Sequence, residues 1–242
     1  MAAIVRLANC FTSIPMINEV LRKVGLRAKY LREKTTKVYF EDPNKIFKDY
    51  PANERYTYSW IRSDLKHSVF FDVRFRERFI YLSKMEGRAA IFEMFLIILL
   101  LAIKLLHEEC QQGIRDSNPK VHVRGLTPPH INEGESGNYY EKYANGGEAG
   151  FVYEGKRWNG TQRIVCIHIN GVAVTDKYVE TVSIESRKEK PDLSKFWPIE
   201  LSGSRYKVKR GEHIMFSPLQ LAQARFEAKL DAQQGEIALG GG

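Results

Sequence analysis

Cysteine is scarce in this chain. Its 242 residues include three cysteines, Cys10, Cys110 and Cys166. Three thiols are too few for a disulfide scaffold, and no two of them have the Cys-x-x-Cys spacing of zinc sites. We therefore expect free thiols. A single disulfide between Cys110 and Cys166 stays open, because both residues follow the apolar segment described below and would lie on the same side of a membrane.

Known catalytic and cofactor-binding motifs are missing too. The sequence contains no Gly-x-Ser-x-Gly elbow, and no Gly-Lys-Ser/Thr follows the double glycine within residues 145–150. We expect no enzyme activity, no bound metal and no cofactor. The alternatives left open are histidines brought together by loops, a Ser-His-Asp or Cys-His site, and a haem or chlorophyll on His107. His168 is predicted to be a half-exposed strand residue. The histidines that form no known ligand pattern are His107, His122, His130, His168 and His213.

Long apolar runs are absent with one exception, residues 89–106. A helix of this length would be about 27 Å long, close to the ~30 Å of a bilayer core. The mean hydropathy of −0.36 excludes a polytopic membrane protein. We predict a single transmembrane span over residues 89–106. The alternative is a soluble protein in which this helix is the buried core, since such helices are also apolar on all sides.

Two ionisable residues, Glu93 and Lys104, lie inside this apolar run. They are about 20° apart around a helix, and Glu86 falls on the same face. A charge near the centre of a bilayer costs about 2.5–3.5 kcal/mol. We therefore expect Glu86, Glu93 and Lys104 to face a partner protein within the membrane.

Basic residues are unevenly distributed. Through Arg88 there are 18 Lys and Arg against 10 Asp and Glu, whereas the rest of the chain has 19 of each. The positive-inside rule then places the N-terminus inside, in the mitochondrial matrix for an inner-membrane protein, and the C-terminal domain outside. Arg74, Arg78 and Arg88 are expected to lie near lipid headgroups.

The segment before the span is predicted to be a basic, aromatic-rich N-terminal arm, residues 1–68. Residues 1–29 have weak mitochondrial-targeting character, or form an amphipathic helix over 16–30. Residues 30–68 are expected to lie extended on a neighbouring protein or lipid surface rather than to bind nucleic acid. A continuous helix is predicted over 69–112, because the single Gly87 costs only about 1 kcal/mol in a helix.

The segment after the span divides into three parts. Residues 113–150 are predicted to be a Gly/Pro-rich linker, and 218–242 a C-terminal helix and tail that begins at Ser217-Pro218. Residues 151–217 are predicted to form a small antiparallel β domain, with hairpin turns at Asn159-Gly160 and Asn170-Gly171. Residues 178–186 are expected to be a further strand. In 164–169, alternate residues are expected to face the core: Val165, Ile167 and Ile169.

The predicted fold class is therefore α+β, with a single transmembrane helix joining the arm to the β domain. We expect a non-catalytic, single-pass accessory subunit of an organellar membrane complex, most simply of the respiratory chain or ATP synthase in the mitochondrial inner membrane. Its expected partners are other subunits and lipid headgroups. Two alternatives stay open: an endomembrane binding module or chaperone with a lumenal β domain, for which Asn159-Gly-Thr161 is a glycosylation sequon, and a basic soluble nucleic-acid-binding protein.

Overall fold

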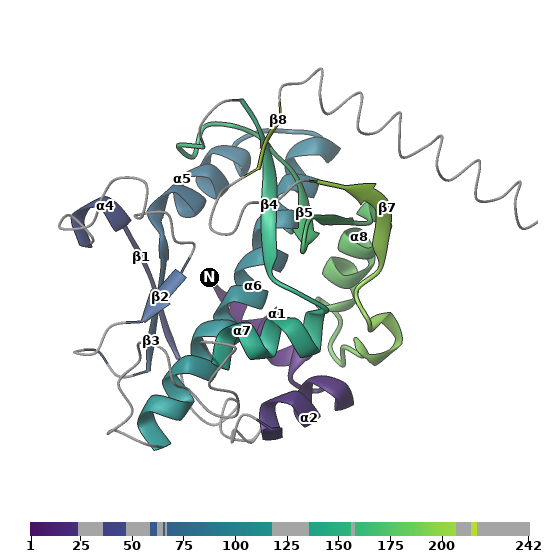
Figure 1. Ribbon diagram of the computed structural model, residues 1–242. Coiled ribbons are helices and arrows are strands. Elements are labelled where there is room, and N and C mark those ends of the chain that lie inside the picture. Colours follow the sequence, from purple (N-terminus) through teal and green to yellow (C-terminus); the bar gives the residue numbers. More distant parts are fainter. Residues whose placement is uncertain are drawn as a thin grey trace, which may run out of the picture.

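Helix α6, Arg88–Ser117, runs through the middle of the molecule, and the other elements pack around it (Figure 1). This is a computed structural model, and it describes residues 1–23, 36–46, 59–61, 65, 67–117, 136–155, 158–206 and 214–216. The fold is mixed α+β. The helices are α1 (Ala2–Phe11), α2 (Pro15–Lys23), α4 (Pro43–Ile46), α5 (Val73–Leu82), α6, α7 (Ser136–Tyr140), the π-helix η2 (Glu141–Asn145), α8 (Asp176–Glu185) and the 3-10 helix η3 (Ser194–Phe196). The strands are β1 (Lys37–Glu41), β2 (Ser59–Ile61), β3 (Ser68–Asp72), β4 (Ala149–Glu154), β5 (Ile164–Ile169), β6 (Val172–Val174), β7 (Leu201–Arg205) and β8 (Ile214–Phe216).

Helix α6 is the one described helix that is long and apolar enough to cross a membrane, with a mean hydropathy of 2.6 over its most apolar 18 residues. Within this chain, however, 72% of its apolar window is buried. It contacts α1, α5, α7 and α8 and strands of both sheets. The side chains of Leu99, Leu100 and Ala102 are fully buried. A helix that is apolar on all sides is buried either by lipid or by protein, and here protein covers most of it.

The continuous helix predicted over 69–112 is wrong, because the structure divides this stretch into three elements. Residues 68–72 form β3, after which Asp72 caps α5 by accepting a hydrogen bond from the Arg74 N–H. Helix α6 starts only after Gly87, whose φ of +112° is accessible to glycine and strained for other residues. The helix propensity of glycine, on which the prediction rested, does not reflect this freedom to turn the chain.

The described parts of the predicted arm fold against the same core. Helix α2 buries Ile17, Val20 and Leu21, and α1 packs against α6. Strands β1, β3 and β2 form a three-stranded sheet in that order, with β1 parallel and β2 antiparallel to β3. The Trp60 ring stacks on Phe70 with a centroid distance of 6.0 Å. These aromatic residues lie within the chain's own sheet, where we had expected a neighbouring surface.

The second sheet has the order β7-β6-β5-β4-β8. Strands β4, β5 and β6 form the predicted antiparallel meander, and β8 adds to β4 in parallel. The Asn170-Gly171 turn is confirmed by positive φ values of 48° and 82°. The connection that contains Asn159-Gly160 is longer than a two-residue turn, because β4 ends at Glu154 and β5 begins at Ile164.

Two predictions for this region are wrong. All six residues of β5 are buried, so the expected exposed face does not exist and His168 is only 4% exposed. Residues 176–185 form helix α8 instead of a strand, capped by Thr175, whose hydroxyl accepts from the Tyr178 N–H at 3.2 Å. The predicted C-terminal helix and tail, 218–242, lie outside the described residues, as do residues 118–135 of the predicted linker.

Candidate functional site

Four polar side chains lie near the C-terminal end of the apolar helix α6. They recur at intervals of three and four residues, so they share one side of the helix. Each is at most 9% exposed. Buried polar groups in an apolar helix need partners, so the surrounding elements have to supply them. The four residues are Lys104, His107, Glu108 and Gln111.

Glu141 is the centre of this cluster. It is the first residue of η2 and 1% exposed, and the glycine turn after η2 closes with a hydrogen bond from the Gly147 N–H to the Glu141 carbonyl. Its Oε1 accepts a hydrogen bond from Lys104 Nζ at 2.8 Å and lies 2.7 Å from His107 Nδ1. Its Oε2 accepts from the Ala149 N–H at 2.6 Å. Although burial opposes ionisation, Lys104 and His107 lower the pKa of Glu141 to about 2.

Both ring nitrogens of His107 are engaged. Nδ1 faces Glu141, and Nε2 lies 2.9 Å from the side-chain amide of Gln111. Burial disfavours the imidazolium, but the hydrogen bond and charge of Glu141 outweigh burial and raise the pKa of His107. The ring is also packed against backbone: a Cβ on Gly137 would lie 2.4 Å from its Cδ2. Any residue larger than glycine at 137 would therefore displace the ring.

The sequence of this part of α6 differs by one residue from a known zinc-binding motif. In the His-Glu-x-x-His motif, two histidines four residues apart bind zinc and the glutamate is the general base, and a separate glutamate is a common third ligand. Here His107 and Glu108 match the first two positions, and Gln111 replaces the second histidine. Glu141 contacts His107 Nδ1, whereas Gln111 lies at Nε2, so the two are on opposite sides of the ring and Glu141 is not placed as a third ligand. The carboxylate of Glu108 accepts a hydrogen bond from Ser59 Oγ at 2.7 Å. Among the described residues, no group of three or more His, Cys, Asp or Glu side chains is placed to hold a metal ion.

The residues singled out from the sequence have partners in their own chain. Glu93, expected to face another protein, instead forms a two-point ion pair with Arg78, with both N···O distances 2.7 Å. Its Oε1 also accepts from the Ile164 N–H at 2.8 Å. Lys104 pairs with Glu141 as described above. Because the partners of Glu93 and Lys104 belong to this chain, neither charge requires a second protein.

The remaining predicted residues fall into two groups. Arg78 is 7% exposed and donates to the Thr161 carbonyl at 2.8 Å, so it lies in the core, where we had expected lipid headgroups. Arg74 is paired with Asp72 and donates to the Trp158 carbonyl. Glu86 and Arg88 are exposed, and Arg88 pairs with Glu180 at 2.9 Å.

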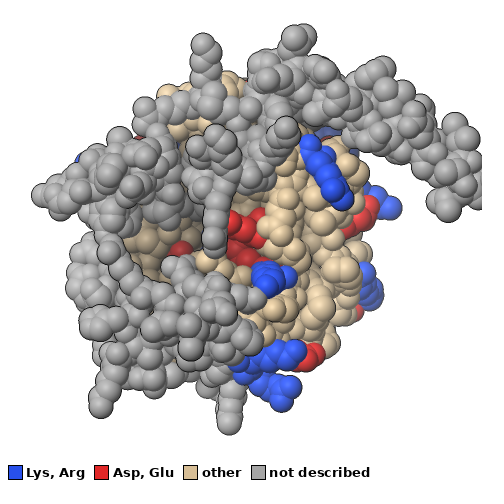
Figure 2. Space-filling view, in the orientation of Figure 1, with Lys and Arg blue, Asp and Glu red and all other residues tan. Residues whose placement is uncertain are grey.

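The charged surface is mixed in sign on the face drawn in Figure 2. Its described Lys and Arg side chains form no continuous patch, and Asp or Glu lies close to several of them (Figure 2). Binding to nucleic acid relies on a continuous basic patch or stripe. The described part of this face therefore adds no support for the nucleic-acid alternative.

The pKa of His168 leads to a testable pH dependence. Burial and the nearby Lys104 lower this pKa to about 4, and Nδ1 accepts a hydrogen bond from the Gly171 N–H, which requires an unprotonated nitrogen. The folded chain thus keeps His168 neutral, while the unfolded chain takes up a proton below its ordinary pKa of 6.5. The free energy of unfolding should lose about 3 kcal/mol from this residue between pH 6.5 and pH 4.

Urea unfolding of the wild type and of His168→Gln at pH 7, 6, 5 and 4 measures this contribution. Glutamine can still accept the Gly171 N–H, so the variant should fold and show a flatter pH dependence. His107 acts with the opposite sign, because its raised pKa gives stability that is present below pH 6.5 and lost as the pH rises. If the free energy of unfolding of His168→Gln depends on pH as steeply as that of the wild type, His168 is not the cause of the pH dependence.

Comparison with known proteins gave no match, neither to a protein family nor to a curated protein nor to a solved structure. The function is therefore argued from the geometry of the chain.

Proposed function

We propose that this protein is non-catalytic and acts by binding, and that α6 is the core helix of its globular fold. The observation that carries the proposal is the ion cluster at Glu141. Lys104 and His107 share one carboxylate oxygen, and Gln111 takes the other ring nitrogen of His107. The Glu141 carboxylate thus holds three elements, α6, η2 and the start of β4, together.

The charge of Lys104 is the main obstacle to a metal ion here. A divalent cation bound to Glu141 would lie about 4 Å from the ammonium group, which gives a repulsion of about 8 kcal/mol at an effective dielectric constant of about 20. The ammonium could not move away without leaving a buried charge unpaired. We infer that Lys104 supplies the positive charge that a metal would supply in a zinc peptidase.

The cysteines offer no nucleophile at this place. Cys110 is fully buried, and burial together with Glu109 and Glu141 raises its pKa well above its ordinary value. The thiol, which is a poor nucleophile, is therefore the form present at neutral pH.

Zinc binding tests the proposal. We would incubate the full chain with zinc, remove free metal by gel filtration and measure bound zinc by plasma mass spectrometry. The wild type should retain no zinc that depends on His107. The double variant Lys104→Met/Gln111→His removes the ammonium and supplies a second histidine four residues after His107, so it should retain zinc where the wild type retains none.

Control variants distinguish zinc bound at His107 from zinc bound by the cysteine thiols. A triple variant with His107→Ala added should lose the zinc again, and Lys104→Met alone should bind little, because Gln111 is a poor zinc ligand. If the wild type binds one zinc that His107→Ala removes, and cleaves peptides with it, the non-catalytic proposal is wrong.

A second candidate function is the single-pass accessory subunit of a mitochondrial inner-membrane complex, with its N-terminus in the matrix. The observation that favours it is the mean hydropathy of 2.6 over an 18-residue window within Arg88–Gly113. To act as a span, α6 would have to exchange its contacts with α1, α5 and α8 for lipid. Extraction of cell membranes with alkaline carbonate distinguishes the two: a core helix leaves the protein in the supernatant, whereas a membrane span keeps it in the pellet.

A further inference from the structure

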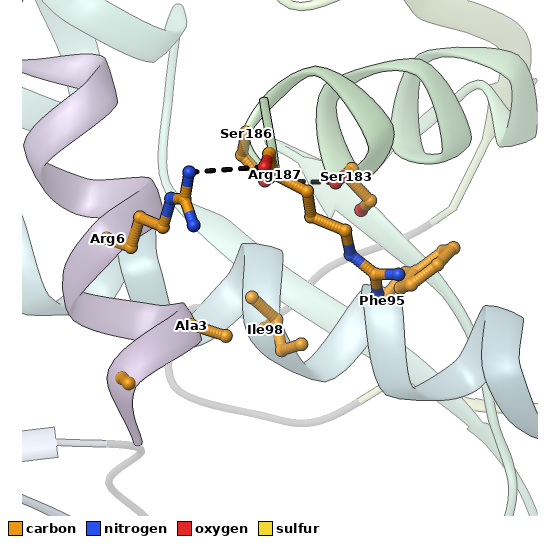
Figure 3. A pocket seen from close by; sticks show the side chains of 8 residues that line it. Ala3, Arg6, Phe95, Ile98, Ser183, Ser186 and Arg187 are labelled. Atoms are coloured by element: carbon orange, nitrogen blue, oxygen red, sulfur yellow. Dashed lines mark hydrogen bonds between the residues drawn. The ribbon is translucent and has the colours of Figure 1, made fainter. Parts of the chain in front are cut away.

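A cavity of about 210 Å³ lies between α1, α6 and α8, away from the cluster at Glu141. Ala2, Ala3 and Arg6 line it from α1, and Phe95 and Ile98 from α6. Figure 3 shows Arg6 directed from α1 at the backbone of Arg187, and the Arg187 side chain extending away from Arg6 to lie over Phe95. The cavity thus has an apolar floor on α6 and a guanidinium group on two sides.

Ser183 of α8 provides a separate indication of a ligand. This residue lines the cavity and is 5% exposed. Its hydroxyl is buried and has no hydrogen-bond partner among the described residues. A buried hydroxyl without a partner is costly and rare in folded proteins, so its presence in a cavity wall points to a group that is bound there.

Arg6 and Arg187 each have more N–H donors than their contacts within the chain use. Arg6 donates from one terminal nitrogen to the carbonyls of Arg187 and Lys188, at 3.2 and 2.5 Å, and these contacts hold α1 against the end of α8. The Arg187 guanidinium lies 4.7 Å from the centre of the Phe95 ring. A guanidinium has five N–H donors in a planar fork that fits a carboxylate.

We propose that this cavity binds a small carboxylate with an apolar body, of about the size of benzoate. The carboxylate lies between Arg6 and Arg187 and accepts the Ser183 hydroxyl, and the apolar body lies on Phe95 and Ile98. An apolar cavity of about 150 Å³ holds benzene, so the larger volume here accommodates a ring plus a carboxylate. Inorganic phosphate fits less well, since most of its oxygen atoms would face apolar side chains.

Titration calorimetry on the full chain tests the site, with benzoate, neutral benzamide and inorganic phosphate as probes. Benzoate should bind, and benzamide should bind about tenfold more weakly, because charge-assisted hydrogen bonds are about twice as strong as neutral ones. Arg187→Gln should weaken the binding of benzoate by about tenfold. Ser183→Ala should weaken it by about fivefold, which corresponds to the loss of one ordinary hydrogen bond. Arg22→Gln, an exposed arginine on α2, is the matched control and should leave benzoate binding unchanged.

Thermal unfolding of Ser183→Ala gives a second measurement that does not depend on the probe. Without ligand this variant should unfold at a higher temperature than the wild type, because it removes an unsatisfied hydroxyl. Saturating benzoate should reduce or reverse the difference. The proposal is overturned if the wild type does not bind benzoate at about 10 mM, far above the affinity of a specific small-molecule site. It is also overturned if benzamide or phosphate binds as well as benzoate, or if Ser183→Ala and Arg187→Gln bind it unchanged.

Discussion

Glu141→Gln should lower the free energy of unfolding by about 3–5 kcal/mol, the usual cost of removing one partner from a buried ion pair. Glutamine keeps the size of the side chain and can still accept the Ala149 N–H, so the main change is the loss of negative charge. Lys104, 4% exposed, would then be a buried cation with no carboxylate on Glu141 to balance it. Urea unfolding followed by circular dichroism at pH 7 measures the effect.

Two further variants make this result specific. Glu148→Gln, an exposed carboxylate close to the same turn, should leave stability unchanged. Lys104→Met combined with Glu141→Gln should cost less than the sum of the two single variants, because residues in one ion pair couple strongly. Equal stability of Glu141→Gln and the wild type would mean that the cluster does not hold η2 on α6.

The same carboxylate should contribute to acid sensitivity. Its pKa is about 2 in the folded chain and 4.5 in its ordinary state, so the stability it provides is complete above pH 4.5 and is lost as the pH falls towards 2. Glu141→Gln should lack this part of the pH dependence.

Part of this fold could be predicted from the sequence because the signals are local. The Asn170-Gly171 turn follows from the positive φ values that asparagine and glycine tolerate, and the strands on both sides of it are as predicted. The length and apolarity of α6 are equally local. The surroundings of α6 cannot be predicted from local signals. Lipid and a protein core both favour apolar residues, so hydropathy does not distinguish a membrane span from a core helix.

The candidate site was missed for a related reason. Glu141 pairs with Lys104, which lies 37 residues earlier in the chain. Glu141 itself lies in the predicted linker, where no sequence pattern indicates a helix or a buried carboxylate. A local signal did exist at Lys104, His107, Glu108 and Gln111, polar residues at helical spacing in an apolar helix. Compared with known ligand sets, the histidines match none, and Gln111 stands where the His-Glu-x-x-His motif has its second histidine.

Glu93→Leu is the variant that best separates a core helix from a membrane span. In the structure Glu93 accepts hydrogen bonds from Arg78 and from the Ile164 N–H, and so joins α5, α6 and β5. Leucine would leave the Arg78 guanidinium buried and unpaired, and we expect the free energy of unfolding to fall by about 3–5 kcal/mol. Denaturant unfolding of the purified chain in the absence of detergent measures this loss.

The double variant Arg78→Leu/Glu93→Leu should recover part of that loss, since replacing both partners of a buried pair by apolar residues is often neutral. Recovery will be incomplete, because the Ile164 N–H and the Thr161 carbonyl also lose a partner. Arg88→Gln, which breaks the exposed pair with Glu180, is the matched control and should change stability much less. If Glu93 faced another protein in a membrane, the isolated chain would tolerate Glu93→Leu without loss, and only its association with that protein would weaken. Full stability of the purified Glu93→Leu chain would therefore refute the assignment of α6 as the core helix.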